Sequence, residues 1–207
     1  MNESISSETA RRRNPERLGA FSDAVIAVII TIMVLELKAP EQATFAALGA
    51  LWPTALSYAV SYLFIAIIWI NHHHLMRFVR EPTNRLIWLN FLHLFLVSLV
   101  PFATQWAART RLGAAPVVVW ASVFVCVDLA YLAFERAVMA QADVSQVPEK
   151  ARRQARLRSL VTVAIFAAAG VAAFASPPWG VALICLALSL FVRPEVPGLR
   201  LAKPAAN

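Results

Sequence analysis

The amino-acid sequence predicts an all-α polytopic membrane protein with six transmembrane helices and both termini in the cytoplasm. Two observations carry this prediction. Hydrophobic residues make up 59% of the 207-residue chain and charged residues only 15%, whereas a soluble domain usually carries about 25% charged residues. The chain also contains six apolar stretches separated by turn residues. This composition excludes a disordered chain and a secreted disulfide scaffold.

The apolar stretches define the expected helices in order, because a bilayer core of about 30 Å needs roughly 20 helical residues. They comprise residues 18–37, 45–71, 83–106, 116–137, 157–175 and 178–192. The sixth is short, and it is either a tilted filler helix or one arm of a re-entrant hairpin with the fifth. Pro53 and Pro101 lie inside apolar stretches and predict a kink or local unwinding.

The expected domain organisation is one six-helix membrane domain over residues 15–193. Loosely ordered cytoplasmic tails are expected at 1–14 and 194–207. The first apolar run is longer than the core of a typical cleavable signal peptide, so we treat it as an uncleaved span.

The positive charges set the predicted orientation. With six crossings and a cytoplasmic N-terminus, 16 of the 19 lysines and arginines face the cytoplasm. The other three are Lys38, Arg109 and Arg111. Such a bias follows the positive-inside rule. The net charge of +7 therefore reflects topology, and the composition argues against a nucleic-acid-binding module, whose basic residues would occupy a polar surface.

Ionisable residues within the spans are the first candidates for function, because they are costly in a membrane. Asp23 lies near the cytoplasmic end of the first span, at the depth of the three histidines 72–74. It is either a first-turn carboxylate that the helix dipole favours or, with Arg17 and Ser22, part of a cross-helix polar network with these histidines. Consecutive helix residues point about 100° apart, so three successive histidines do not predict a metal site.

Two further features have competing interpretations. For Asp128, inside the fourth span, we favour a hydrogen bond to another helix over a proton relay. Val28, Thr31, Ile32 and Leu35 form one stripe along the first span, which is typical of helix packing but also allows a pore lining. No nucleophile elbow, phosphate-binding loop or Cys-x-x-Cys motif is present, so neither an enzyme nor a cofactor is predicted.

Two motifs resemble a known family. Residues 17–23, Arg-Leu-Gly-Ala-Phe-Ser-Asp, fit the Arg-x-x-x-Phe-Ser-Asp signature of the transmembrane protein 175 family of potassium channels from endolysosomes and prokaryotes. Residues 69–73, Trp-Ile-Asn-His-His, are similar to its Trp-x-x-His-His pattern. Leu89-Asn90 and Val100-Pro101-Phe102 also look familial. The resemblance covers the first three spans by motif and the last three by length and hydropathy.

The resemblance implies a modestly selective potassium channel of the prokaryotic plasma membrane. In this family, single six-helix chains assemble as homotetramers, so the implied partners are potassium ions, the bilayer and further copies of the chain. The first helix of each subunit lines the pore, where apolar side chains form the gate and a threonine layer aids selectivity. The implied pore residues are Val28, Thr31, Ile32 and Leu35.

The family's motif positions imply a network that holds the first helix at its cytoplasmic end. Its members here are Arg17, Phe21, Ser22, Asp23, Trp69, His72 and His73. One departure is that Val28 is smaller than the usual Ile or Leu, which moves the narrowest ring toward Ile32 or Leu35. The alternative function is a proton-coupled secondary transporter that uses the intramembrane aspartates and histidines. A membrane enzyme or assembly factor has the least support.

Overall fold

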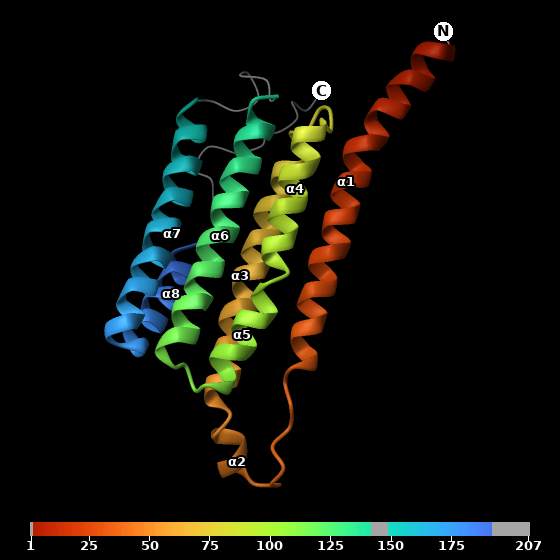
Figure 1. Ribbon diagram of the computed structural model, residues 1–207. Helices are drawn as coiled ribbons and strands as arrows, with labels where there is room; N and C mark the ends of the chain where they lie inside the picture. Colours follow the sequence, from red (N-terminus) through yellow and green to blue (C-terminus); the bar gives the residue numbers. More distant parts are fainter. Residues whose placement is uncertain (1, 142–148, 192–207) are drawn as a thin grey trace, which may run out of the picture.

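The structure is a bundle of helices in which successive spans run in opposite directions (Figure 1). This computed structural model describes residues 2–141 and 149–191, with side chains from Pro15 onward except at 150–152, 155 and 191. The described helices are α1 (Asn2–Leu35), α2 (Phe45–Gly49), α3 (Trp52–Met76), α4 (Asn84–Val97), α5 (Val100–Arg109), α6 (Ala114–Met139), α7 (Glu149–Ala175) and α8 (Pro177–Phe191). The all-α prediction is confirmed.

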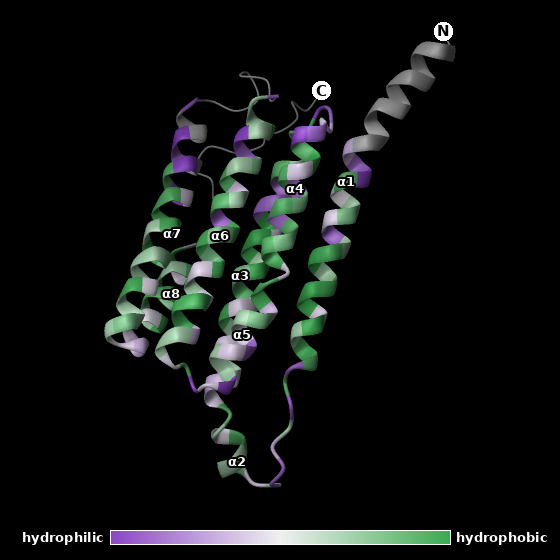
Figure 2. Cartoon of the chain, in the orientation of Figure 1, coloured by the Kyte–Doolittle hydropathy of each residue, from purple (hydrophilic) through white to green (hydrophobic). Residues whose placement is uncertain are grey.

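Five segments are long and apolar enough to cross a membrane. They are Pro15–Leu35, Trp52–Met76, Asn84–Arg109, Ala114–Met139 and Arg156–Ala175. The helix Pro177–Leu190 is apolar but shorter, as predicted for the sixth span. Figure 2 shows hydrophobic residues along the middle of the bundle and hydrophilic residues gathered toward its ends.

The first helix begins earlier than predicted. Its backbone is helical from Asn2, through the expected loose tail 1–14 and past Pro15. Hydropathy detects only the membrane-crossing part of a helix, whereas Ala, Arg and Glu in the preceding segment are good helix formers in water. The predicted tail 194–207 lies outside the described residues.

The two internal prolines interrupt their spans, as predicted. Pro53 lies in the first turn of α3, directly after the break at residues 50–51. Pro101 lies in the first turn of α5, after the break at residues 98–99. A first turn tolerates proline because its N–H would have no partner within the helix.

The core is centred on α6, where several large side chains are fully buried. Phe124 stacks on Phe64 of α3 with ring centroids 3.8 Å apart and meets Phe166 of α7 edge to face at 5.2 Å. A buried polar junction lies nearby. The hydroxyls of Ser61 and Thr104 are 2.7 Å apart, and Trp120 Nε1 donates to Ser61 Oγ at 2.9 Å. This junction joins α3, α5 and α6.

The α7–α8 pair approaches backbone to backbone at Gly180. A Cβ added there would lie 2.7 Å from the Cβ of Ala173 and 2.9 Å from the carbonyl oxygen of Ala169. Gly170 has more room, since its added Cβ would lie 3.7 Å from the Cβ of Ala121. The absence of a side chain at Gly180 therefore lets the short helix α8 seat against α7.

Candidate functional site

Helix α1 lies at the edge of the bundle, against α3, α4 and α5 (Figure 1). One face of it enters the core through Ile26, Ile29 and Met33, which are at most 5% exposed. The opposite face carries the predicted stripe. Val28, Ile32 and Leu35 are 55%, 45% and 77% exposed, and Thr31 is also exposed. The chain by itself therefore leaves this apolar stripe uncovered.

A buried polar cluster ties α1 to the bundle. Asn90 of α4 donates from Nδ2 to Ser22 Oγ of α1 at 2.9 Å. Its Oδ1 lies 2.8 Å from Nε2 of His72 on α3. Because a carbonyl oxygen only accepts, His72 Nε2 carries the proton. All three residues are fully buried, so these hydrogen bonds fix the position of α1 against two helices.

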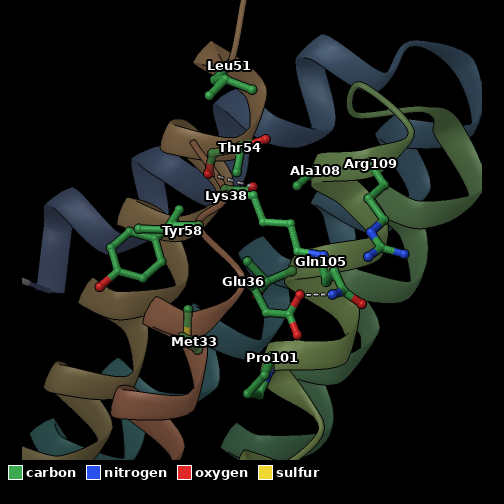
Figure 3. Close-up of a pocket in the computed structure, with 13 residues that line it drawn as sticks. Met33, Glu36, Lys38, Leu51, Thr54, Tyr58, Pro101, Gln105, Ala108 and Arg109 are labelled. Carbon is green, nitrogen blue, oxygen red and sulfur yellow. Dashed lines mark hydrogen bonds between the residues drawn. The ribbon is translucent and has the colours of Figure 1, made fainter. Parts of the chain in front are cut away.

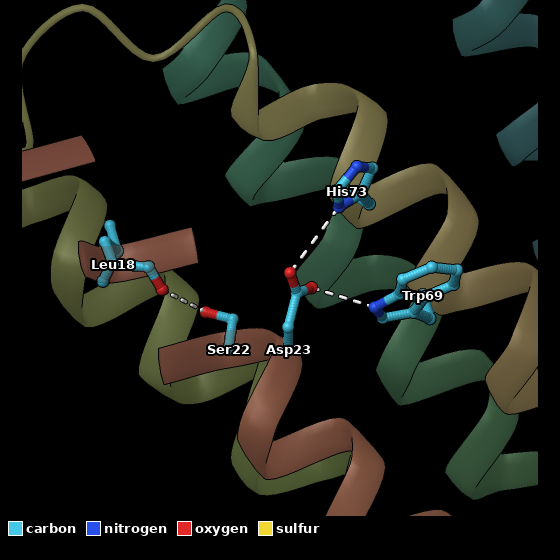
Figure 4. Close-up of polar contacts among 5 residues, drawn as sticks. All are labelled: Leu18, Ser22, Asp23, Trp69 and His73. Carbon is cyan, nitrogen blue, oxygen red and sulfur yellow. Dashed lines mark hydrogen bonds and ion pairs between the residues drawn. The ribbon is translucent and has the colours of Figure 1, made fainter. Parts of the chain in front are cut away.

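A second, solvent-accessible cluster forms around the next residue, Asp23 (Figure 4). Trp69 Nε1 donates to Asp23 Oδ1 at 2.9 Å, and His73 Nδ1 lies 3.6 Å from Asp23 Oδ2. The side chains of Asp23 and His73 are 37% and 43% exposed. Because Ser22 and Asp23 point about 100° apart on α1, adjacent residues contact different partners.

The structure thus brings five of the predicted network residues to one end of the bundle, divided between two clusters. Ser22 and His72 belong to the buried one, and Asp23, Trp69 and His73 to the accessible one. The other two predicted residues belong to neither cluster. Phe21 is 46% exposed and packs against Phe91 at a centroid distance of 5.5 Å. Arg17 is exposed and forms no hydrogen bond or ion pair with these residues.

Sequence reasoning missed the central role of Asn90. The available signal was an amide in the middle of an apolar helix, within the Leu89-Asn90 pair already noted as familial. A buried amide needs partners for its donors and its acceptor. That requirement predicts a hydrogen-bonding function, although it does not identify the partners.

Further polar groups lie deeper in the bundle. His93 of α4 stacks on His72 at 5.8 Å and lies 5.8 Å from the ring of Tyr131. Neither ring nitrogen of His93, nor Oδ2 of Asp128, has a hydrogen-bond partner among the described residues. The predicted helix–helix hydrogen bond of Asp128 is therefore wrong for this structure. Spacing along α6 gives the depth of the carboxylate but not what faces it.

The three successive histidines all belong to α3, which continues to Met76. In the part of the chain that the structure describes, no three metal-ligating side chains gather closely enough to hold an ion. Hydrogen bonds therefore hold the polar clusters together.

An apolar bundle with several membrane-length helices, joined by buried polar contacts, is the architecture of a polytopic helical membrane protein. Residues 17–101 match the family described as endosomal/lysosomal potassium channel TMEM175. The matched region contains both polar clusters and the α1 stripe, so this part of the chain is similar to the TMEM175 family.

Curated relatives carry related descriptions. A potassium channel of Chryseobacterium sp. (strain P1-3) is 40% identical over 123 residues, covering 59% of this chain and 64% of the relative. A potassium channel of Streptomyces collinus is 36% identical over 125 residues, covering 56% of this chain and 61% of the relative. The mouse endosomal/lysosomal proton channel TMEM175 is 36% identical over 102 residues, covering 44% of this chain and 20% of the relative. The alignments thus span less than two thirds of these relatives.

A solved structure shares the fold. The crystal structure of a lysosomal potassium-selective channel TMEM175 homolog from Chamaesiphon minutus superposes with a TM-score of 0.76. The match covers 86% of this chain and 96% of the other, with 24% sequence identity. It establishes a common helix arrangement that extends beyond the region carrying the family motifs.

Proposed function

We propose that the protein is a potassium-permeable cation channel of the prokaryotic plasma membrane. Four copies assemble with α1 of each at the central axis. The observation that carries the proposal is the uncovered stripe Val28, Thr31, Ile32 and Leu35, which lies on the face of α1 opposite its own bundle. The family match and the bacterial relatives named potassium channels support the choice of ion.

Thr31 suits the role of a selectivity layer. Its hydroxyl donates to the carbonyl oxygen of Val28 at 2.8 Å, so its proton is engaged by the helix itself. The hydroxyl oxygen then remains available as an acceptor on the exposed face. Four such oxygens around an axis would replace part of the hydration shell of a potassium ion.

The apolar members of the stripe suit the role of a gate. A ring narrower than a hydrated ion excludes water and blocks conduction without any charged group. Leu35 is the most exposed of these side chains, whereas Val28 is the smallest. Gating then requires a modest rotation or displacement of α1, and the Ser22 and Asp23 clusters anchor the end about which α1 moves.

Potassium flux through the purified protein in liposomes tests this function. Val28→Ala and Leu35→Ala should raise the flux or weaken the preference for potassium over sodium, because each widens an apolar ring. Val34→Ala is the matched control, since Val34 is 48% exposed but lies off the stripe. Unchanged flux and selectivity in both stripe variants would show that α1 does not line the pathway.

A proton-coupled secondary transporter is the second candidate. The observation in its favour is the set of buried polar atoms of His93 and Asp128 that have no hydrogen-bond partner among the described residues. Vertebrate relatives are also named proton channels. Such a transporter would show potassium flux that saturates and is strictly coupled to a proton gradient. Asp128→Asn should then abolish the coupling, whereas a channel would conduct potassium without any gradient of protons.

A further inference from the structure

A cavity of about 170 Å³ lies where α1 and α5 end and α3 begins (Figure 3). This end of the bundle is opposite the two polar clusters. Its apolar wall includes Met33, Leu51 and Pro101. The cavity has room for several water molecules but is smaller than the roughly 300–1,000 Å³ of pockets that enclose a drug-sized ligand. It therefore fits a headgroup rather than a whole amphiphile.

The charges around the cavity favour an anion. Lys38 and Arg109 both line it, and neither forms an ion pair with a described residue. The carboxylate of Glu36 accepts a hydrogen bond from Gln105 Nε2. Figure 3 shows the Lys38 and Arg109 side chains extending toward Gln105. Two cations against one engaged carboxylate leave a net positive charge.

Neutral donors complete the lining. Thr54 and Tyr58 also line the cavity, and their side-chain hydroxyls form no hydrogen bond with the described residues. Trp52 and Trp106 lie next to this end of the helices and are 53% and 37% exposed. Tryptophan is enriched at the level of lipid headgroups. The cavity thus combines free donors and cations at a depth where headgroups are found.

We propose that this cavity binds a phosphate group, supplied by the headgroup of an anionic phospholipid. Arg109 presents a fork of N–H donors that matches phosphate oxygens, and Lys38 adds a second positive charge. The acyl chains would leave the cavity along the apolar surface of the neighbouring helices. Because Glu36 and Lys38 directly follow α1, an occupied site would hold the end of that helix farthest from Ser22.

The binding test uses the full chain in neutral detergent and does not depend on ion flux. Native mass spectrometry counts phosphatidylglycerol and phosphatidylcholine molecules retained per chain, and thermal unfolding is followed with each lipid and with inorganic phosphate. Lys38→Gln/Arg109→Gln should bind phosphatidylglycerol roughly tenfold more weakly, since it removes two partly exposed ionic contacts. Arg111→Gln is the matched control, because Arg111 is a basic residue at the same end that does not line the cavity.

The lipid arms separate the possible sources of the phosphate. Preferential binding of phosphatidylglycerol that the double variant loses and Arg111→Gln retains supports the proposal. Stabilisation by inorganic phosphate alone, with the same dependence on Lys38 and Arg109, keeps the phosphate site but overturns the lipid as its source. Equal loss in the Arg111→Gln control indicates diffuse surface charge and overturns the site. Phosphatidylglycerol binding that is unchanged in the double variant also overturns the site.

Discussion

Helices α1 and α6 have similar hydropathy but different positions in the bundle, α1 at its edge and α6 at its centre. Within the most apolar 18 residues of each, 56% are buried in α6 and only 22% in α1. Helix α6 is held by interlocked aromatic rings, whereas α1 is attached on one side and is fixed at one end by polar contacts. Lipid tails are as apolar as leucine, so an apolar surface alone does not drive a membrane helix onto its neighbours. Hydrogen bonds therefore matter most for the peripheral helix.

The largest expected effect lies in α6. Phe124→Ala removes a ring that contacts Phe64 and Phe166 and should lower the free energy of unfolding by about 3 kcal/mol, because a packed cavity is left behind. Thermal or denaturant unfolding in detergent measures the loss. Leu35→Ala, on the exposed face of α1, should leave the stability of the single chain unchanged. Equal losses for the two variants would show that α1 and α6 do not differ in how much their side chains stabilise the single chain.

The next effect concerns the attachment of α1. Asn90→Leu leaves the buried groups of Ser22 and His72 without their partner and should cost about 2 kcal/mol of unfolding free energy. Ser98→Ala is the control, since the Ser98 hydroxyl donates to the carbonyl oxygen of Phe95 in its own segment and to no other described residue. In a double-mutant cycle, Ser22→Ala should add little to Asn90→Leu. Additive losses would show that the two residues act independently.

A smaller effect is expected in the α7–α8 pair. Gly180→Ala places a methyl group 2.7 Å from the Cβ of Ala173 and should destabilise the chain by about 1–2 kcal/mol. Gly170→Ala meets only ordinary van der Waals contact and should be neutral or slightly stabilising. Unfolding measurements on both variants compare the sites directly. A stabilised Gly180→Ala variant would mean that α8 does not seat closely against α7.

The smallest effect on stability is expected at Asp23. In Asp23→Asn, the amide oxygen still accepts from Trp69 and only the contact with His73 is weakened, so the loss should stay below about 1 kcal/mol. Because this contact orients α1, we expect assembly or gating to suffer more than permeation. Size-exclusion chromatography and liposome flux measure the two. Normal assembly and gating with an altered ion preference would contradict an anchoring role.

The spans and their interruptions were predictable from local sequence. Hydropathy located the membrane-crossing helices, and the chemistry of Pro53 and Pro101 required the breaks that follow residues 49 and 97. Asp23 and the histidines 72–74 were expected at one depth, because antiparallel helices bring the end of one beside the start of the next, and Asp23 lies 3.6 Å from His73. Depth in a membrane is a one-dimensional property that the sequence encodes directly.

Contacts around a helix axis were not predictable in the same way. Periodicity defines a stripe but not which neighbour faces it, so the division of Ser22 and Asp23 between two clusters was missed. The lack of a partner for Asp128 was missed for the same reason. The helical conformation of the polar first turns of α1 was not predicted, because hydropathy does not report on helices in water. The cavity beside Lys38 depends on three helix ends meeting in space, which no local pattern describes.

The junction of Ser61, Thr104 and Trp120 has a consequence for how the bundle selects its own packing. Sliding one helix by a single residue moves its side chains about 1.5 Å along the axis and turns them by about 100°. Apolar surfaces tolerate such a shift by repacking, but these hydroxyl and indole groups would lose their partners where no water can replace them. The junction therefore sets the axial and rotational alignment of α3, α5 and α6, and discriminates the native arrangement from neighbouring ones of similar apolar contact.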